Sequence, residues 1–299
     1  MSGAIDHDGG VMELAECTLI ASWPPGTFAE NLAVSAAGDI FVTIHNASQV
    51  VRITRDGDVS PFASFPVPVA GIAFDPQGVM WVSGGTPGTA PGSIWKVTQG
   101  GCVSQWCEIP DALFLNGMTM HPDGAHLVVA ESLLGLVIEV DIASAGHRVW
   151  LQHPLLAPRA IGQTPGANGI KFLGGDAYIS VTDRDIIVRA NLMKTDGPDA
   201  VQIVAEHIRA DDFAVGADHA LYIATHPANS LLRLAISGER TTLAGPQQGM
   251  AGATAVAFGR SDEDADCVYV TTTGGLFAPV DGVIQPARLV RVRTRTRAI

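Results

Sequence analysis

The chain has 299 residues, of which 47% are apolar and only 16% are charged, and its formal net charge at pH 7 is −12. The apolar content suffices to build a sizeable core, so the composition excludes an intrinsically disordered chain. Because phosphate binding requires a net basic surface, the acidic balance excludes nucleic acid as the main partner. One basic run stands at the end of the sequence, and a solvated terminus explains it: Arg291, Arg293, Arg295 and Arg297.

No apolar stretch approaches the roughly 18 residues that a membrane-spanning helix needs. The first eight residues are polar and acidic, whereas a signal peptide has a basic start and an apolar middle. Four cysteines do not make a disulfide framework, and the spacing of Cys102 and Cys107 fits neither a zinc site nor a redox pair. We therefore expect a cytoplasmic globular protein with free thiols and no membrane partner.

In chain order, an apolar segment at residues 13–21 precedes six similar units. Each unit has an apolar strand, then a short strand with a large residue at one fixed place, then an alternating strand that carries a charged residue; a fourth strand follows in the first five units. The large residues are Phe41, Trp81, Leu127, Tyr178, Tyr222 and Tyr269. The alternating strands begin at Gln49, Ser93, Leu136, Ile186, Ser230 and Arg288.

This repeat predicts an all-β fold, a six-bladed β-propeller with four antiparallel strands per blade. A β-sandwich has similar short strands but not this fixed order within each period. Because the sixth unit has no room for a fourth strand, we expect the N-terminal strand to pair with the last blade and close it. The predicted organisation is a single domain over residues 11–299 that follows a disordered N-terminus at residues 1–10.

The sequence lacks the motifs of nucleophile elbows, zinc proteases, P-loops and dinucleotide-binding folds, so the function must follow from propeller geometry. The first residue of each innermost strand lies at one mouth of the central channel. These six positions hold Glu30, Ala70, Asn116, Asn168, Asp211 and Thr254. Two carboxylates and two amides suit a hard divalent cation such as Ca²⁺, Mg²⁺ or Mn²⁺, although any one of them can simply face solvent or cap a turn.

The residue that follows each second strand returns to the same mouth, where His45 and His226 are candidates for proton transfer. The alternative for each histidine is a ring that faces solvent or forms a hydrogen bond to a loop. Asp212 is expected on the other face of its strand, where it would form hydrogen bonds between blades. Three further histidines lie in hairpin turns at the far end and are expected to be solvated: His121, His126 and His219.

Six stretches of the sequence resemble the SMP-30/gluconolactonase family of six-bladed propellers with one divalent metal. They are residues 29–31 (AEN), 116–124 (NGMTMHPDG), 168–170 (NGI), 211–213 (DDF), 254–259 (TAVAFG) and 269–271 (YVT). The resemblance implies one divalent cation, Ca²⁺ first, with Mg²⁺, Mn²⁺ or Zn²⁺ as alternatives. It implies that Glu30, Asn116, Asn168 and Asp211 bind this cation, and that Asp211 also acts as the base that activates water.

Phe114 stands where sugar-lactone members of the family carry an arginine, so we expect a more apolar substrate. Residues 114–117 (FLNG) and 258–260 (FGR) resemble a divergent branch of natural-product pathways, in which some members act as cyclases of the hetero-Diels–Alder type. The predicted function is a metal-dependent hydrolase of a lactone or related ester; the alternative is a cyclase or pericyclase, and a protein-binding scaffold ranks third. The substrate is a small molecule, with Asn116, Phe114, His45 and His226 as its predicted contacts; the sequence leaves the oligomeric state open.

Overall fold

The computed structural model describes residues 11–12, 14–160, 164–192 and 200–299. The predicted disorder of residues 1–10 lies outside this part of the chain. The described residues are nearly all in β-strands and turns, and the short helices are 3₁₀ turns of three residues each. No described helix has the length and apolar character that crossing a bilayer requires.

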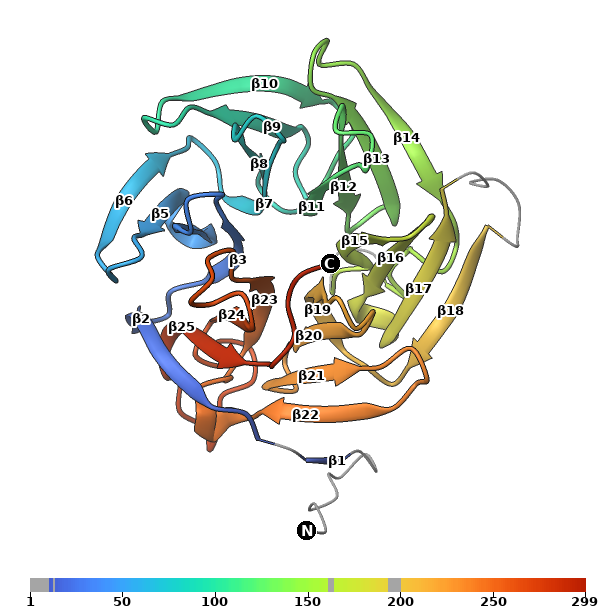
Figure 1. Cartoon of the computed structure of the whole chain (residues 1–299). Helices are drawn as coiled ribbons and strands as arrows, with labels where there is room; N and C mark the ends of the chain where they lie inside the picture. Colours follow the sequence, from blue (N-terminus) through green and yellow to red (C-terminus); the bar gives the residue numbers. More distant parts are fainter. Residues whose placement is uncertain (1–10, 13, 161–163, 193–199) are drawn as a thin grey trace. The chain divides into compact units, whose positions relative to one another are not determined.

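Six β-sheets follow one another along the chain, as predicted, and the fold is a six-bladed β-propeller (Figure 1). Blade 1 contains β3 (Ala29–Val34), β4 (Ile40–Ile44), β5 (Gln49–Ile53) and β6 (Val59–Ser64). Blade 2 contains β7 (Val69–Phe74), β8 (Met80–Gly84), β9 (Gly92–Val97) and β10 (Val103–Ile109). Blade 3 contains β11 (Leu115–Met120), β12 (His126–Glu131), β13 (Leu136–Asp141) and β14 (His147–Gln152).

The last three blades continue the same order of strands. Blade 4 contains β15 (Ala167–Leu173), β16 (Asp176–Val181), β17 (Ile186–Asn191) and β18 (Val201–Glu206). Blade 5 contains β19 (Ala210–Val215), β20 (Leu221–Thr225), β21 (Ser230–Leu234) and β22 (Arg240–Ala244). Blade 6 contains β23 (Ala253–Phe258), β24 (Cys267–Thr272) and β25 (Pro286–Arg293).

The N-terminal strand completes the last blade, as predicted. β2 (Cys17–Pro25) pairs antiparallel with β25, and the strand order of the blade is β2-β25-β24-β23. Figure 1 shows β2 running along β25. The strand lies four residues further along the chain than residues 13–21, because its register follows β25, which the local sequence does not reveal.

One element escaped the sequence analysis. β1 (Val11–Met12) pairs in parallel with β22, so blade 5 has five strands instead of four. A two-residue strand has too short a pattern to be recognised, since its pairing depends only on the edge that it meets.

The described contacts divide the chain into two compact units. Unit 1 comprises residues 1–42, 52–60 and 211–299, and unit 2 comprises residues 43–51 and 61–210. Each has its own buried apolar core, in which five of the six large residues named above are buried. Tyr178 is the exception, with intermediate burial. The single domain over residues 11–299 stays a prediction.

Within unit 2, side-chain hydroxyls on the second strand of one blade bond to the inner strand of the next blade. Thr43 Oγ1 donates to the Ala70 carbonyl at 2.7 Å, and Ser83 Oγ donates to the Asn116 carbonyl at 2.8 Å. The strands approach so closely that a Cβ atom at Gly71 would lie 2.3 Å from the Asn116 carbonyl oxygen. Only glycine fits there, so this backbone contact fixes the place where each inner strand begins.

We predict that removal of β2 opens the last blade. A chain that begins at Pro25 would expose the hydrogen-bonding edge of β25, so it should aggregate or lose cooperative unfolding in urea. A chain that begins at Val11 retains both β1 and β2 and should unfold like the full chain. Cooperative unfolding of the shorter chain at the same urea midpoint would contradict the role of β2.

Candidate functional site

Three carboxylates gather in unit 1, on the inner strands of blades 1 and 5. Glu30 on β3 and the pair Asp211 and Asp212 on β19 are 5%, 6% and 3% exposed. The other residues of both strands are mostly apolar and buried, which explains why the polar side chains are carried into the interior. Asn31 Nδ2 donates to Asp212 Oδ2 at 3.2 Å, which agrees with the expectation that Asp212 bonds between blades.

The surroundings of the Glu30 carboxylate disfavour its negative charge and leave one of its oxygens without a hydrogen bond among the described residues. Burial, followed by the negative charges of Asp211 and Asp212, raises the pKa of Glu30 well above its ordinary value. Its Oε2 atom is buried and has no hydrogen-bond partner among the described residues. A buried oxygen without a donor, beside two further carboxylates, is the arrangement that a divalent cation stabilises. The residues of unit 1 therefore fit the predicted metal.

His226 follows β20 and belongs to the same group. Its Nδ1 atom lies 3.1 Å from Asp211 Oδ2, and the two side chains are 10% and 9% exposed. If the Nδ1 hydrogen is donated to the carboxylate, the neutral ring keeps its lone pair on Nε2. That Nε2 atom is buried and has no partner in the described part of the chain, so it can accept a proton from a bound molecule.

Two aromatic rings pack beside His226, and sequence analysis missed both. Phe277 lies in the segment between β24 and β25; its ring centroid is 5.4 Å from that of His226 and 5.5 Å from that of Phe28. Phe28 is also in edge contact with His226, at 6.5 Å. Phe277 remains 65% exposed. The available signal was the long insertion in the sixth unit, where the spacing between alternating strands is greatest.

The two predicted amides lie in unit 2, on β11 and β15. Asn116 Nδ2 donates to Ser132 Oγ at 3.2 Å, and Asn168 Nδ2 donates to Thr182 Oγ1 at 3.0 Å. These bonds fix the orientation of each amide, since the NH₂ group is taken by a hydroxyl. Asn116 Oδ1 is buried with no partner among the described residues. Register shifts between Leu115 and Met118 and at the equivalent place on β15 re-aim both side chains.

The other two predicted contacts also lie in unit 2. His45 bonds through Nδ1 to the carbonyl of Val69, the first residue of β7, at 3.0 Å. Burial lowers the pKa of His45, although the Val69 bond opposes the shift, which favours the neutral ring. Phe114 packs against the His45 ring at 6.2 Å. The Glu131 carboxylate accepts from the Phe114 backbone amide at 2.6 Å and anchors the loop.

The predicted residues thus form two groups, one in each unit. Unit 1 brings together Glu30, Asp211 and His226. In unit 2, His45 packs against Phe114, and the two amides lie on the inner strands β11 and β15. Three of the six buried polar atoms without partners in the described residues belong to this predicted set: Glu30 Oε2, Asn116 Oδ1 and His226 Nε2.

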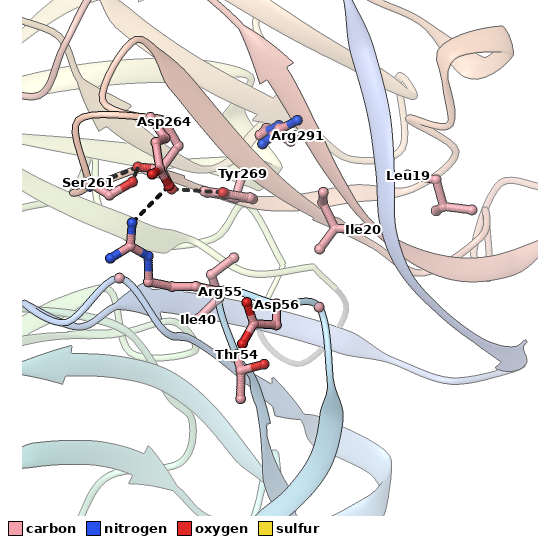
Figure 2. A pocket seen from close by; sticks show the side chains of 13 residues that line it. Leu19, Ile20, Ile40, Thr54, Arg55, Asp56, Ser261, Asp264, Tyr269 and Arg291 are labelled. Atoms are coloured by element: carbon pink, nitrogen blue, oxygen red, sulfur yellow. Dashed lines mark hydrogen bonds and ion pairs between the residues drawn. The ribbon is translucent and has the colours of Figure 1, made fainter.

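A pocket of about 310 Å³ in unit 1 is a different feature (Figure 2). Its walls come from β2, the turn after β5 and blade 6, and none of the predicted site residues lines it. Two pairs of its polar groups bond to each other: Arg55 Nη2 lies 2.8 Å from Glu263 Oε2, and the Tyr269 hydroxyl donates to Asp264 at 2.8 Å. Because none of the predicted site residues lines this pocket, the predicted chemistry does not involve it.

We predict that the metal-free protein loses stability as pH rises, because of Glu30. A group whose pKa is raised on folding stabilises the fold below its unfolded value, and that contribution disappears as pH rises through the folded pKa. In EDTA, the free energy of unfolding should therefore fall from pH 5 to pH 8, and Glu30→Gln should fall less. Ca²⁺ should restore the wild type at pH 8 but not the variant. Parallel pH profiles of the two proteins would contradict this account.

No protein-family model matches the chain, and no curated protein matches its sequence. Solved structures match over nearly its whole length. Regucalcin from Agrobacterium tumefaciens, a calcium-binding protein, matches with a TM-score of 0.68 at 14% identity. The match covers 96% of this chain and 98% of the regucalcin chain. A gluconolactonase from Xanthomonas campestris has a TM-score of 0.68 at 12% identity, with coverages of 93% and 89%.

Virginiamycin B lyase from Staphylococcus aureus is also similar, with a TM-score of 0.61 at 16% identity, and the match covers 97% of this chain and 86% of the lyase. At such identities a structural likeness establishes the fold and leaves the reaction open. The chain is therefore a six-bladed β-propeller that shares its fold with a calcium-binding protein, a gluconolactonase and a lyase.

Proposed function

We propose that the protein is a metal-dependent hydrolase of a lactone or related ester, with an apolar substrate. The observation that carries the proposal is the buried Oε2 of Glu30, which has no partner in the described residues and faces the charges of Asp211 and Asp212. Structural proteins have little reason to bury three adjacent carboxylates, because their repulsion and desolvation destabilise the fold.

The donor set fits a hard cation, Ca²⁺ best, with Mg²⁺, Mn²⁺ or Zn²⁺ as alternatives. Glu30 and Asp211 would hold it. Asn116 and Asn168 belong to the other unit, and their part is proposed from their amide oxygens and from the family resemblance. When bound, the cation would polarise the substrate carbonyl and stabilise the oxyanion that forms on hydrolysis.

Proton transfer is proposed for the pair of His226 and Asp211. The family resemblance gives the role of base to Asp211. The 3.1 Å contact supports a second assignment, in which Asp211 orients the imidazole and the free Nε2 atom of His226 takes the proton of the attacking water.

Several aromatic residues support an apolar substrate. Phe28 and Phe277 lie against His226, and Phe114 lies against His45 where an arginine would serve a sugar. Each substrate hydroxyl buried without a partner would cost about 1–3 kcal/mol. Aryl or alkyl lactones, and polyketide- or terpenoid-like esters, therefore suit these surroundings better than gluconolactone.

The alternative is a cyclase or pericyclase of natural-product biosynthesis. The aromatic residues beside His226 favour it, because folding an apolar substrate requires an apolar wall. The similar lyase supports it too, since it is a propeller named for another reaction. In this alternative the cation is absent or structural. The cytoplasmic setting and the natural-product role stay predictions.

We predict hydrolysis of aryl or alkyl lactones that requires added Ca²⁺, Mg²⁺, Mn²⁺ or Zn²⁺, with poor turnover of gluconolactone. His226→Gln and Asp211→Asn should each lower kcat/KM by roughly 10²- to 10⁴-fold, the usual contribution of a general base. Measured metal content separates the two roles, because only Asp211→Asn should also weaken cation binding. His219→Asn, outside the site, is the control.

Strong gluconolactone turnover would contradict the apolar substrate. Absence of turnover with every lactone and metal, despite binding of an apolar ligand, would favour the cyclase. Full activity of both site variants would remove His226 and Asp211 from the mechanism.

We predict that Phe277 contributes to substrate binding. Phe277→Ala should raise KM for an aryl lactone by about 5- to 10-fold, the loss of one aromatic contact, and leave kcat nearly unchanged. Ile236→Ala is a matched control, because Ile236 is 78% exposed in the turn between β21 and β22. Equal KM values in wild type and Phe277→Ala would show that the ring does not contact the substrate.

A further inference from the structure

The hairpin between β11 and β12 gathers two imidazoles and a carboxylate. His121, Asp123 and His126 each offer one ligand atom, and these atoms all lie within 4.8 Å of one another. All three residues belong to unit 2 and are exposed or half-buried. Both histidines lie in a hairpin turn for which solvated side chains are expected, and the proposed hydrolase makes no use of them.

The backbone of the hairpin brings the three side chains together. The His121 amide donates to the His126 carbonyl at 2.8 Å, which places the two histidines opposite each other across the strands. The Gly124 amide donates to the His121 carbonyl at 2.9 Å, and Gly124 has a φ of +69°, which closes the turn. Asp123 therefore lies over the gap between the two rings.

The two oxygens of Asp123 have different roles. Oδ1 accepts from the Ala125 and His126 amides at 2.8 and 3.2 Å and so holds the turn. Oδ2 faces both rings, 2.9 Å from Nδ1 of His121 and 2.7 Å from Nδ1 of His126. Ligands of tetrahedral zinc lie roughly 3.3 Å apart, so a small outward movement would admit an ion.

The contacts of His121 depend on which ring nitrogen carries the hydrogen. When Nδ1 carries it, Nδ1 donates to Asp123 Oδ2, which lies 2.9 Å away. When Nδ1 is deprotonated, its single lone pair can either accept from the Asp123 amide at 3.3 Å or bind a metal ion. Metal binding would therefore replace the long contact with the Asp123 amide.

The surroundings of His126 also suit a metal ligand. If Nδ1 binds the ion, the opposite Nε2–H faces carboxylates at 3.9 Å (Asp141 Oδ2) and 4.0 Å (Glu139 Oε1). Carboxylates beside the far nitrogen are typical of histidines that bind zinc, because they raise the basicity of the ring. Arg148 holds Glu139 in place with bonds of 2.8 and 3.0 Å.

The equivalent hairpin of blade 2 shows that the turn itself needs no histidine. There Asp75 occupies the position of His121; its Oδ1 accepts from the Gln77 and Val79 amides, and its Oδ2 accepts from the Trp81 indole. One aspartate satisfies that turn completely. The histidine pair of blade 3 therefore provides nitrogen ligands that hairpin formation does not require.

We propose that His121, Asp123 and His126 form a binding site for one first-row transition-metal ion, Zn²⁺ in the first instance, with water completing the coordination. Two imidazole nitrogens select Zn²⁺, Ni²⁺ or Cu²⁺ over Ca²⁺, whereas the carboxylates around Glu30 suit the hard cation. The two sites are thus distinguished by ligand chemistry. The hairpin site does not depend on the proposed hydrolase activity.

The test is calorimetric titration of the EDTA-stripped full chain with ZnCl₂ in excess Ca²⁺, which occupies carboxylate sites. The wild type should bind one more equivalent of Zn²⁺ than His121→Ala or His126→Ala. Asp123→Asn retains an oxygen for the turn and should weaken binding at least tenfold. His147→Ala is the matched control, an exposed histidine of the same blade that should bind like the wild type.

Thermal unfolding without metal checks that each variant folds. Equal Zn²⁺ stoichiometry and affinity in wild type, His121→Ala and His126→Ala would overturn the proposal, as would the absence of Zn²⁺ binding by the wild type. Ca²⁺-dependent lactone hydrolysis should be the same in wild type and His121→Ala. Failure of the hydrolase assay would leave the Zn²⁺ measurement intact, so the two proposals can fail separately.

Discussion

The close approach of inner strands is the constraint on which the candidate site depends. In unit 2 a hydroxyl from one blade donates to the carbonyl of the second residue of the next inner strand, and the space beside Asn116 admits only a glycine, Gly71. Gly117 is under the same restriction, because a Cβ atom there would lie 2.4 Å from the Asn168 carbonyl oxygen. The backbone is therefore fixed where the functional side chains begin, and rigid placement is what a binding site requires.

This rigidity also explains why the polar atoms of the site can lack partners. A flexible interior would let Glu30 turn toward a donor or admit water, since a buried oxygen without a hydrogen bond costs about 1–3 kcal/mol. In unit 1 the backbone beside Glu30 is held in a similar way, because Thr254 Oγ1 donates to the Ala29 carbonyl at 2.8 Å. A site that holds unpaired oxygens in fixed positions is preorganised for binding a cation.

The repeat made most of the fold predictable. Strand order, the buried large residues and the completion of the last blade by β2 all follow from a pattern that recurs six times, because each blade must bury the same faces. The site was predictable only where it follows the same repeat. Glu30 and Asp211 are each the second residue of an inner strand, and His226 directly follows a second strand, whereas Phe277 lies in the long insertion of the sixth unit. Glu131 anchors its loop by accepting a hydrogen bond from the Phe114 amide, and no local sequence pattern predicts a contact between these two distant positions.

The pairing of β2 with β25 has a consequence for synthesis. The two strands are separated by about 260 residues, so β2 leaves the ribosome long before its partner exists. At ~5–20 residues per second, the delay is on the order of 10 to 50 seconds. During that time an uncharged strand ending in Trp23, Pro24 and Pro25 has no sheet to join. Because proline has no N–H group to donate, the end of this unpaired strand cannot form a full ladder of hydrogen bonds with another chain. The same segment that completes the last blade is therefore less prone to aggregate before β25 is synthesised.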